Sequence, residues 1–330
     1  QKYVVKSHMT KKSKEKCKKE LKQKIKVLIK PIIAFLYPAI GYPLVRLYKR
    51  DNVFKKYDVT LCAIFRNEAL FLKEWIDYHR TIGIEHFYLY NNFSDDDYAS
   101  VLRPYIEQGL VDLTEWPEKE YGQLKAYQDC YNRFRNDSHW IGYIDLDEFI
   151  CPLRNATIQE WLKRYDRYPS VLICWKMFGT SGRAEHDPNQ LSIEQYTSAW
   201  PEITDVGKSI INTRFRFQKV FHPHYFYAYY SVGKLRIPIP PVNEYKKFLL
   251  FWRHKYPVFR RPLHTIQLNH YWSRAYKNYI YKDLVRGNIL NPRYNLMNNI
   301  EGRFEYHELK NTTKDYSILR FLIFLKRENR

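Results

Sequence analysis

Apolar and polar segments alternate regularly through the first half of the chain. Val59–Phe65 is a short apolar run with a β-branched start, which is typical of a buried parallel strand. The next segment, 68–82, has apolar residues at helical spacing, and Gly83 is the kind of residue that ends a helix. His86–Tyr90 is a second apolar run. The pattern therefore predicts a strand–helix–strand unit with a right-handed crossover.

The alternation continues towards residue 149. Ser94 and Asp97 resemble a capping box at the start of a helix that extends to residue 108. The remaining segments predict a strand at 110–116, a helix at 123–135 and a strand at 140–144. Four strands separated by three helices indicate the α/β class, with an open, Rossmann-like and mostly parallel sheet. Ligands of such sheets bind outside the carboxyl ends of the strands.

Polar clusters follow the predicted strands at those carboxyl ends, at 66–68, 91–95 and 145–148. In the third cluster, Asp145 and Asp147 can aim at one point if the chain turns there. Two carboxylates that share a site repel each other unless a cation neutralises them, and a divalent cation also binds phosphate oxygens. The alternative is that Asp145 caps a turn while Asp147 faces solvent. The chain has neither the glycine-rich loop of dinucleotide folds nor that of P-loop proteins.

Charge separates the chain into an arm and a body. The net charge is +20, and residues 1–57 carry 17 Lys and Arg against three Asp and Glu, or +14, which leaves +6 for the rest. The apolar share of 45% excludes disorder for most of the chain. The uneven charge argues against a nucleic-acid enzyme, which would spread basic residues over its working face. We therefore expect no nucleic-acid partner.

The arm, 1–57, combines a Lys-rich stretch at 10–26 with an apolar stretch that Pro31, Pro38 and Pro43 interrupt. A spanning helix needs about 20 unbroken apolar residues, so we expect short basic amphipathic helices that lie on an anionic membrane surface. A helical extension packed on the body and a nucleic-acid arm are the alternatives. The tail, 291–330, ends in an apolar and then basic segment that resembles the arm.

Cellular location is inferred from the thiols and the arm together. Five cysteines at wide spacings form no metal or disulfide pattern, which favours free thiols in a reducing compartment. No cleavable signal peptide is visible, and residues 1–9 look like the remnant of an expression vector. We expect a peripheral protein on the cytoplasmic face of a bacterial inner membrane.

Four segments carry a resemblance to a known family. They are CAIFRNEALFLKEWIDYHRTIGIEHFYLYNNFSDD at 62–96, WIGYIDLDEF at 140–149, WKMFGTSG at 175–182 and NHYWSRAYKNYIYKDLVRG at 269–287. Their order and spacing resemble glycosyltransferase family 92 and related family 2-like bacterial enzymes, which have the GT-A fold. The resemblance covers 58–290, and it implies a catalytic domain between the arm and the tail. It also implies inverting, Mn²⁺- or Mg²⁺-dependent transfer of a sugar, with UDP-galactose as the first donor to consider.

The resemblance assigns roles to several residues. The metal motif matches Asp145 and Asp147, and a third ligand would be His270 or, as the second choice, His222. The nucleoside would lie against the first strand and the two loops beside it, at Ala63, Phe65, Arg66, Glu68, Asn92 and Asp95. Arg66 could instead pair with a phosphate or with Glu68. Gln123 would face the sugar or the diphosphate unless it is a plain surface residue, and Lys282 would cover the phosphates together with Asp145.

An inverting transfer also needs a base for the acceptor hydroxyl. Glu185 is the first candidate and Asp187 the second, because both follow the 175–182 segment, where an acceptor would enter. The acceptor would be a glycan or a lipid-linked glycan of a surface polysaccharide. A metal-dependent nucleotidyltransferase or phosphatase is one competing hypothesis. A non-catalytic protein that binds anionic lipid or nucleic acid is the other.

Overall fold

The structure is a computed structural model that describes residues 39–217, 220, 222–249, 263–286 and 300–328. One nine-stranded sheet in the order β3-β2-β1-β4-β7-β6-β10-β5 forms its centre, with β11 paired to β7, and β8 and β9 form a separate hairpin. The strands are β1 (Tyr57–Phe65), β2 (His86–Asn91), β3 (Val111–Glu115), β4 (Ser138–Tyr143), β5 (Glu148–Pro152), β6 (Ser170–Phe178), β7 (Ser198–Asn212), β8 (Ala228–Val232), β9 (Leu235–Ile239), β10 (Ile266–His270) and β11 (Thr313–Lys314).

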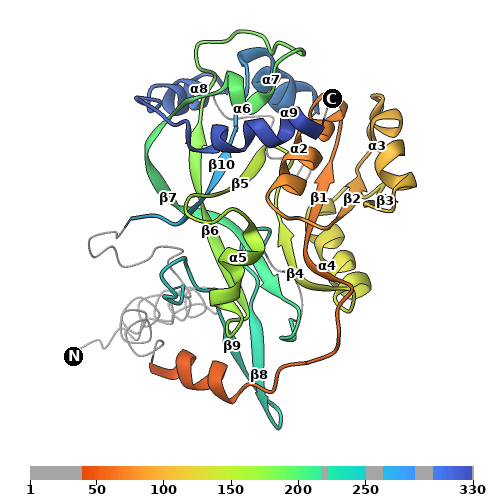
Figure 1. The fold of residues 1–330 in the computed structure, drawn as a ribbon, viewed down its shortest axis with the longest axis vertical. Helices are drawn as coiled ribbons and strands as arrows, with labels where there is room; N and C mark the ends of the chain where they lie inside the picture. Colours follow the sequence, from red (N-terminus) through yellow and green to blue (C-terminus); the bar gives the residue numbers. More distant parts are fainter. Residues whose placement is uncertain (1–38, 218–219, 221, 250–262, 287–299, 329–330) are drawn as a thin grey trace, which may run out of the picture.

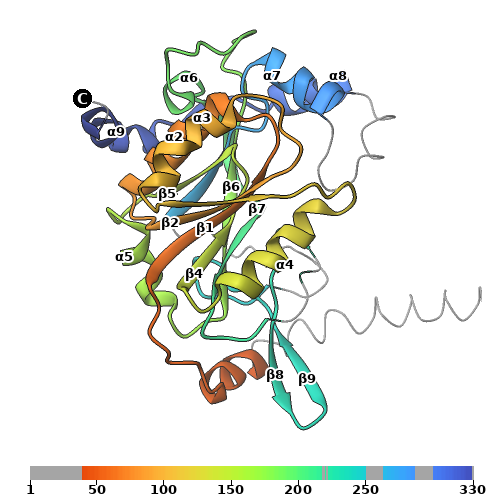
Figure 2. The same ribbon diagram turned by 90° about the vertical axis from the view of Figure 1, so that its right-hand side faces the viewer.

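Helices cover both faces of the sheet. Figure 2 shows α2, α5 and α9 on one side and α4 on the other. The helical elements are an unlabelled helix at 39–47, α2 (Ala69–Thr81), α3 (Tyr98–Glu107), α4 (Gly122–Phe134), α5 (Ile158–Leu162), η1 (Lys163–Tyr165), α6 (Ser192–Gln195), α7 (Tyr276–Ile280), the π-helical η2 (Tyr281–Arg286), α8 (Ile300–Glu308), η4 (Ser317–Phe321) and α9 (Leu322–Glu328).

The α/β prediction is confirmed, and so is the mostly parallel sheet. The four strands and three helices expected in the first half are all present, and β1 pairs in parallel with both β2 and β4. Only β5 and β7 run against the main strand direction within the described sheet, because β7 is antiparallel to β4 and β6 while β5 is antiparallel to β10. The carboxyl ends of β1, β2, β4, β6 and β10 therefore lie along one edge.

The long strand β7 was not expected from the sequence. Its segment contains Pro201, Glu202, Asp205 and Gly207, so it lacks the regular alternation of an ordinary strand. Gly207 is required by packing, since a Cβ there would lie 1.8 Å from the carbonyl oxygen of Ile173 on β6. This close approach lets β7 run between β4 and β6 and carry its side chains into the centre of the sheet.

The last part of the predicted arm packs on the body. This agrees with the alternative in which the arm is a helical extension of the body. In the 39–47 helix, Leu44 and Val45 are buried, and the Tyr42 hydroxyl donates to the carbonyl oxygen of Lys246 at 2.9 Å. The membrane-lying helices predicted for residues 1–38 fall outside the described residues. No described helix is both long enough and apolar enough to cross a bilayer.

The described part of the tail is also docked on the body. In η4 and α9, Ile318, Phe321 and Leu325 are buried, and Arg320 donates to the carbonyl oxygen of Leu153 at 3.1 Å. Strand β11 adds to the central sheet beside β7. Residues 300–328 therefore belong to the same packed unit as the strands before them.

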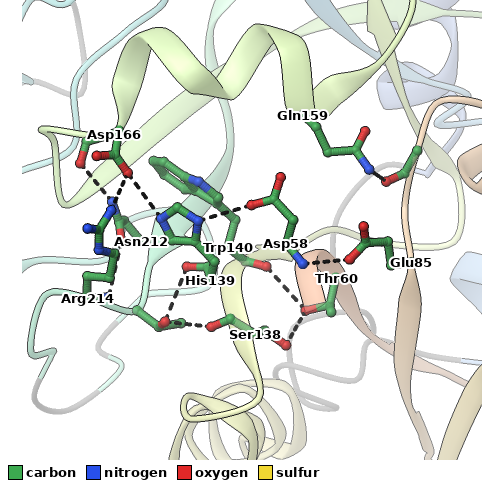
Figure 3. Close-up of polar contacts among 12 residues, drawn as sticks. Asp58, Thr60, Glu85, Ser138, His139, Trp140, Gln159, Asp166, Asn212 and Arg214 are labelled. Carbon is green, nitrogen blue, oxygen red and sulfur yellow. Dashed lines mark hydrogen bonds and ion pairs between the residues drawn. The ribbon is translucent and has the colours of Figure 1, made fainter. Parts of the chain in front are cut away.

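A charged cluster joins five segments near the amino-terminal end of β4 (Figure 3). His139 lies between two carboxylates, with Nδ1 3.0 Å from Asp58 Oδ1 and Nε2 3.2 Å from Asp166 Oδ1. Asp166 also accepts hydrogen bonds from Arg214 at 2.7 Å and Arg50 at 3.1 Å. The cluster ties the chain that leaves the 39–47 helix to β1, β4, the segment after η1, and β7.

We expect this cluster to make the free energy of unfolding depend on pH. Burial disfavours a charged His139, but the hydrogen bonds that its ring donates to Asp166 and Asp58 outweigh this effect and raise the pKa of the imidazole. A raised pKa stabilises the fold at pH below the ordinary value of about 6.5, and that contribution is lost as the pH rises through the raised pKa. His139→Gln should therefore cost more stability at acidic than at alkaline pH in chemical denaturation.

The matched control is His222→Gln, because His222 is exposed and lies outside this cluster. It should give the same loss of stability, near zero, at both pH values. An equal destabilisation by His139→Gln at both pH values would show that the imidazolium contributes nothing to the fold.

Candidate functional site

The site is built around the turn between β4 and β5, which contains Asp145, Asp147 and Glu148. The sequence prediction that the two aspartates follow β4 directly is confirmed, since β4 ends at Tyr143. Glu148 is fully buried and braces the turn: its Oε2 accepts from the Asp145 N–H at 2.8 Å and its Oε1 from Trp175 Nε1 at 2.7 Å. Burial raises the pKa of the Glu148 carboxyl well above its ordinary value. Glu148 thus acts as a support for the two aspartates.

Asp145 is held by side chains from α4 and β7. Its Oδ1 accepts from Gln123 Nε2 at 2.8 Å and from the Tyr127 hydroxyl at 3.3 Å, and its Oδ2 accepts from Lys208 Nζ at 2.8 Å. Burial alone would raise the pKa of Asp145, but the Lys208 ammonium outweighs it and lowers the pKa below its ordinary value. Asp145 is therefore a carboxylate with a built-in counter-ion, and Gln123 is part of the site rather than a plain surface residue.

Asp147 is more enclosed than Asp145 and faces different cations. Its Oδ2 forms an ion pair with Lys282 on η2, and its Oδ1 lies 3.6 Å from His270 Nε2 at the end of β10. Burial would raise the pKa of this carboxyl, but Lys282 and His270 outweigh it and hold the pKa well below its ordinary value. The side chain of Asp147 is 8% exposed, against 34% for Asp145 and 29% for Lys282. The site opens to solvent on the side of Asp145 and Lys282.

Arg274 supports the turn from behind. Its guanidinium donates to Glu68 Oε2 at 2.5 Å and to the Leu146 carbonyl oxygen at 3.0 Å, and it lies 3.4 Å above the Phe71 ring. Arg274 is buried, so this ion pair fixes the start of α2 against the middle of the acidic turn. Glu68, predicted beside the nucleoside, is thus engaged with Arg274. Arg66 keeps a buried Nε without a hydrogen-bond partner among the described residues.

The other residues predicted for the nucleoside lie at the carboxyl ends of β1 and β2. Ala63 and Phe65 are buried in β1. Asn92 is buried as well, and its Nδ2 donates to the carbonyl oxygens of Trp116 and Glu118, which ties together the loops after β2 and β3. Asp95 is exposed. Nucleoside contacts at these positions stay a prediction.

The predicted bases lie in the loop after β6. Glu185 is exposed and forms an ion pair with Lys277 on α7. Asp187 accepts from the Asn189 N–H at 2.9 Å, so one of its oxygens closes a turn in its own loop. No hydrogen bond or ion pair joins this loop to Asp145 or Asp147 within the described ranges. A catalytic role for either carboxylate stays a prediction.

The three predicted metal ligands do not form a complete metal site. Among the described residues, no three His, Cys, Asp or Glu side chains gather closely enough to hold an ion. The reason is that both oxygens of Asp145 are taken by Gln123, Tyr127 and Lys208. His222, the second choice for the third ligand, lies beside His224, with 5.0 Å between the ring centroids.

Asp147 and His270 nevertheless fit a divalent cation as a pair. The 3.6 Å between Oδ1 and Nε2 is too long for a hydrogen bond, so the two atoms face each other without sharing a proton. Mg²⁺ and similar ions are often held by one or two protein ligands, with water and substrate phosphates completing the shell. The donor set therefore suits an ion that arrives with a diphosphate.

Sequence reasoning missed Lys208 and Arg274, the two buried cations that hold the turn. The apolar residues at 210–211, shortly after Lys208, could have indicated that this segment is a strand. Arg274 lies in the last of the four segments that carried the family resemblance. Neither could be placed beside an aspartate without knowing how β7 and β10 pair.

One family model and several plant proteins match this chain. The model of Glycosyltransferase family 92 matches residues 55–315. A family 92 protein of Oryza sativa is 34% identical over 136 residues, which are 40% of this chain and 23% of the relative. The galactan beta-1,4-galactosyltransferase GALS3 of Arabidopsis thaliana is 30% identical over 137 residues, or 37% of this chain and 27% of the relative. The chain spans only about a quarter of the length of these two plant relatives.

Two solved structures each align over less than half of this chain. S. aureus TarS 1–349 in complex with UDP-GlcNAc has a TM-score of 0.33 at 14% identity, over 47% of this chain and 45% of that one. The mannosyltransferase PcManGT from Pyrobaculum calidifontis in complex with GDP-Man and Mn²⁺ has a TM-score of 0.28 at 18% identity, over 43% of this chain and 46% of that one.

The family match covers both halves of the acidic site, from Glu68 on α2 to Lys282 on η2. It also extends beyond residue 290, the predicted end of the catalytic domain, and includes α8 and β11. The chain belongs to glycosyltransferase family 92.

Proposed function

We propose that this chain transfers a sugar from a nucleoside diphosphate donor to a glycan acceptor. One observation carries the proposal. At the carboxyl end of β4, the pKa values of Asp145 and Asp147 are lowered by the neighbouring side chains of Lys208 and Lys282. The chain's membership of a glycosyltransferase family supports sugar transfer over the competing nucleotidyltransferase, phosphatase and non-catalytic hypotheses. The named activity of the galactan galactosyltransferase relatives favours galactose, and the family resemblance favours UDP as the carrier.

In this proposal, Asp147 and His270 would hold Mn²⁺ or Mg²⁺, which would supply positive charge to the leaving diphosphate. Lys282 is the described cation best placed to follow the diphosphate, because it is partly exposed and already lies against Asp147. Gln123 and Asp145 line the open side of the site, where the sugar would lie. Lys208 and Arg274 keep the turn in place and are too buried to meet a substrate directly.

The proposed chemistry is a single displacement with inversion. The acceptor oxygen forms a bond to the anomeric carbon as the bond from that carbon to the diphosphate oxygen breaks. The electron pair leaves with the diphosphate, and the hydroxyl proton passes to a carboxylate base. We propose Glu185 as the base ahead of Asp187, because Glu185 is exposed, whereas Asp187 is half-buried and accepts hydrogen bonds within its own turn.

The proposed cellular setting is a membrane surface. The Lys-rich stretch at 10–26 supports peripheral attachment to an anionic bilayer. The proposed bilayer is the inner membrane of a bacterium, at its cytoplasmic face. This placement would bring the enzyme to lipid-linked glycan acceptors. The support lies in the composition of the arm.

We expect Asp147→Asn to abolish most of the sugar transfer. It removes the negative charge that faces His270 and Lys282, and it replaces one carboxylate oxygen with an NH2 group that cannot bind a metal ion. The value of kcat/KM for the sugar donor should fall by at least about 100-fold, equivalent to about 2.7 kcal/mol of transition-state stabilisation. Asp112→Asn on the exposed strand β3 is the matched control and should leave turnover unchanged. Normal turnover by Asp147→Asn would refute the metal site.

Lys282→Met should weaken the binding of UDP while leaving the fold intact, because this side chain is partly exposed. A charge-assisted hydrogen bond contributes about 1.5–3 kcal/mol, so the dissociation constant for UDP in calorimetry should rise by about tenfold or more. Lys277→Met, which removes a lysine of α7 that is 70% exposed, should not change it. Equal constants for Lys282→Met and the unaltered chain would place the diphosphate elsewhere.

The two base candidates can be separated by isosteric changes. Glu185→Gln should lower kcat for transfer by about 100-fold or more, the range of general base catalysis, while donor binding is kept. Asp187→Asn should lower kcat much less. The reverse order would assign the base to Asp187, and normal turnover in both variants would place the base outside this loop.

A further inference from the structure

One end of the molecule is formed by two elements that are distant in sequence. The 39–47 helix and the β8–β9 hairpin lie side by side at the bottom of Figures 1 and 2. Tyr48, directly after the helix, joins them: its ring centroid is 4.6 Å from that of Phe215 and 6.2 Å from that of Tyr230 on β8. The Tyr48 hydroxyl also accepts from the Arg216 N–H at 2.9 Å. The two elements therefore present one continuous surface.

This end exposes aliphatic side chains that the core does not use. Val232 and Leu235, on either side of the hairpin turn, are 58% and 61% exposed. On the helix, Leu47 is 67% exposed, although Leu44 and Val45 of the same helix are buried against the body. Gly233 adopts a φ of +57°, which permits the tight turn that pushes Val232 and Leu235 outward.

The charges around these side chains all have one sign. Arg46, Lys49, Lys234 and Arg236 are exposed. The sequence has no Asp or Glu in either 39–50 or 225–243. Aliphatic side chains surrounded by cations suit a surface with an anionic outer layer and an apolar interior. A single-stranded nucleic acid would instead favour aromatic side chains for stacking.

Along the sequence, the Lys-rich stretch at 10–26 lies before the 39–47 helix, with residues 27–38 between them. We propose that the hairpin turn Val232–Leu235 and the outer side of the 39–47 helix form a docking face for an anionic lipid bilayer. Val232, Leu235 and Leu47 enter the boundary of the acyl region, and the four cations meet the headgroups. This inference rests on the proposed membrane attachment and extends it from the arm to the folded body.

The test is co-sedimentation of the full chain with lipid vesicles. Vesicles of phosphatidylcholine with about 30 mol% phosphatidylserine provide the anionic surface, and pure phosphatidylcholine the neutral one. We expect Leu235→Glu to weaken partitioning onto the anionic vesicles by about tenfold or more, because it places a charge where the aliphatic side chain would insert. Leu309→Glu is the control: Leu309 is 80% exposed and follows α8 at the opposite end of the molecule.

A second variant separates this inference from the attachment on which it rests. Lys18→Glu combined with Lys19→Glu reduces the charge of the arm and leaves the hairpin unchanged. If this double variant binds vesicles weakly while Leu235→Glu binds like the unaltered chain, the arm alone attaches the protein and the docking face is refuted. If neither variant changes vesicle binding, both proposals are refuted. Sugar transfer to a soluble acceptor should be unchanged by Leu235→Glu, which shows that its fold is intact.

Discussion

The pairing of the acidic turn after β4 with buried cations is the constraint on which the rest of the site depends. Burying the carboxylates of Asp145 and Asp147 costs free energy unless opposite charges accompany them. Lys208 supplies the charge for Asp145, and Lys282 supplies it for Asp147. The turn can therefore hold two ionised carboxylates at the edge of the core, where a diphosphate and its metal ion would need them.

The compensating charges come from the second half of the chain. Lys208 is carried by β7, which runs between β4 and β6, and His270 by β10 on the far side of β6. Arg274 links that half to the start of α2 through Glu68. The first half of the sheet thus positions the aspartates, and the second half supplies the positive charges that lower their pKa values. Neither half would form this site alone.

This division explains what could be predicted from the sequence. Local periodicity placed the first four strands and three helices, and the end of β4 placed Asp145 and Asp147 at the ligand-binding edge. Gln123, His270 and Lys282 were expected near them and are found there. Lys208 and Arg274 were out of reach because they depend on strand pairing between distant segments. The three-ligand metal site stays a prediction, because Lys208 occupies an oxygen of Asp145 in this structure.

The central claim is that Asp147 and His270 bind a metal ion that carries the diphosphate. The most direct measurement is anomalous diffraction at the manganese edge from crystals grown with Mn²⁺ and UDP. We predict one strong peak in contact with Asp147 Oδ1, His270 Nε2 and both phosphates of UDP. A diphosphate bound against Lys282 without a manganese peak, or a peak away from these two residues, would contradict it.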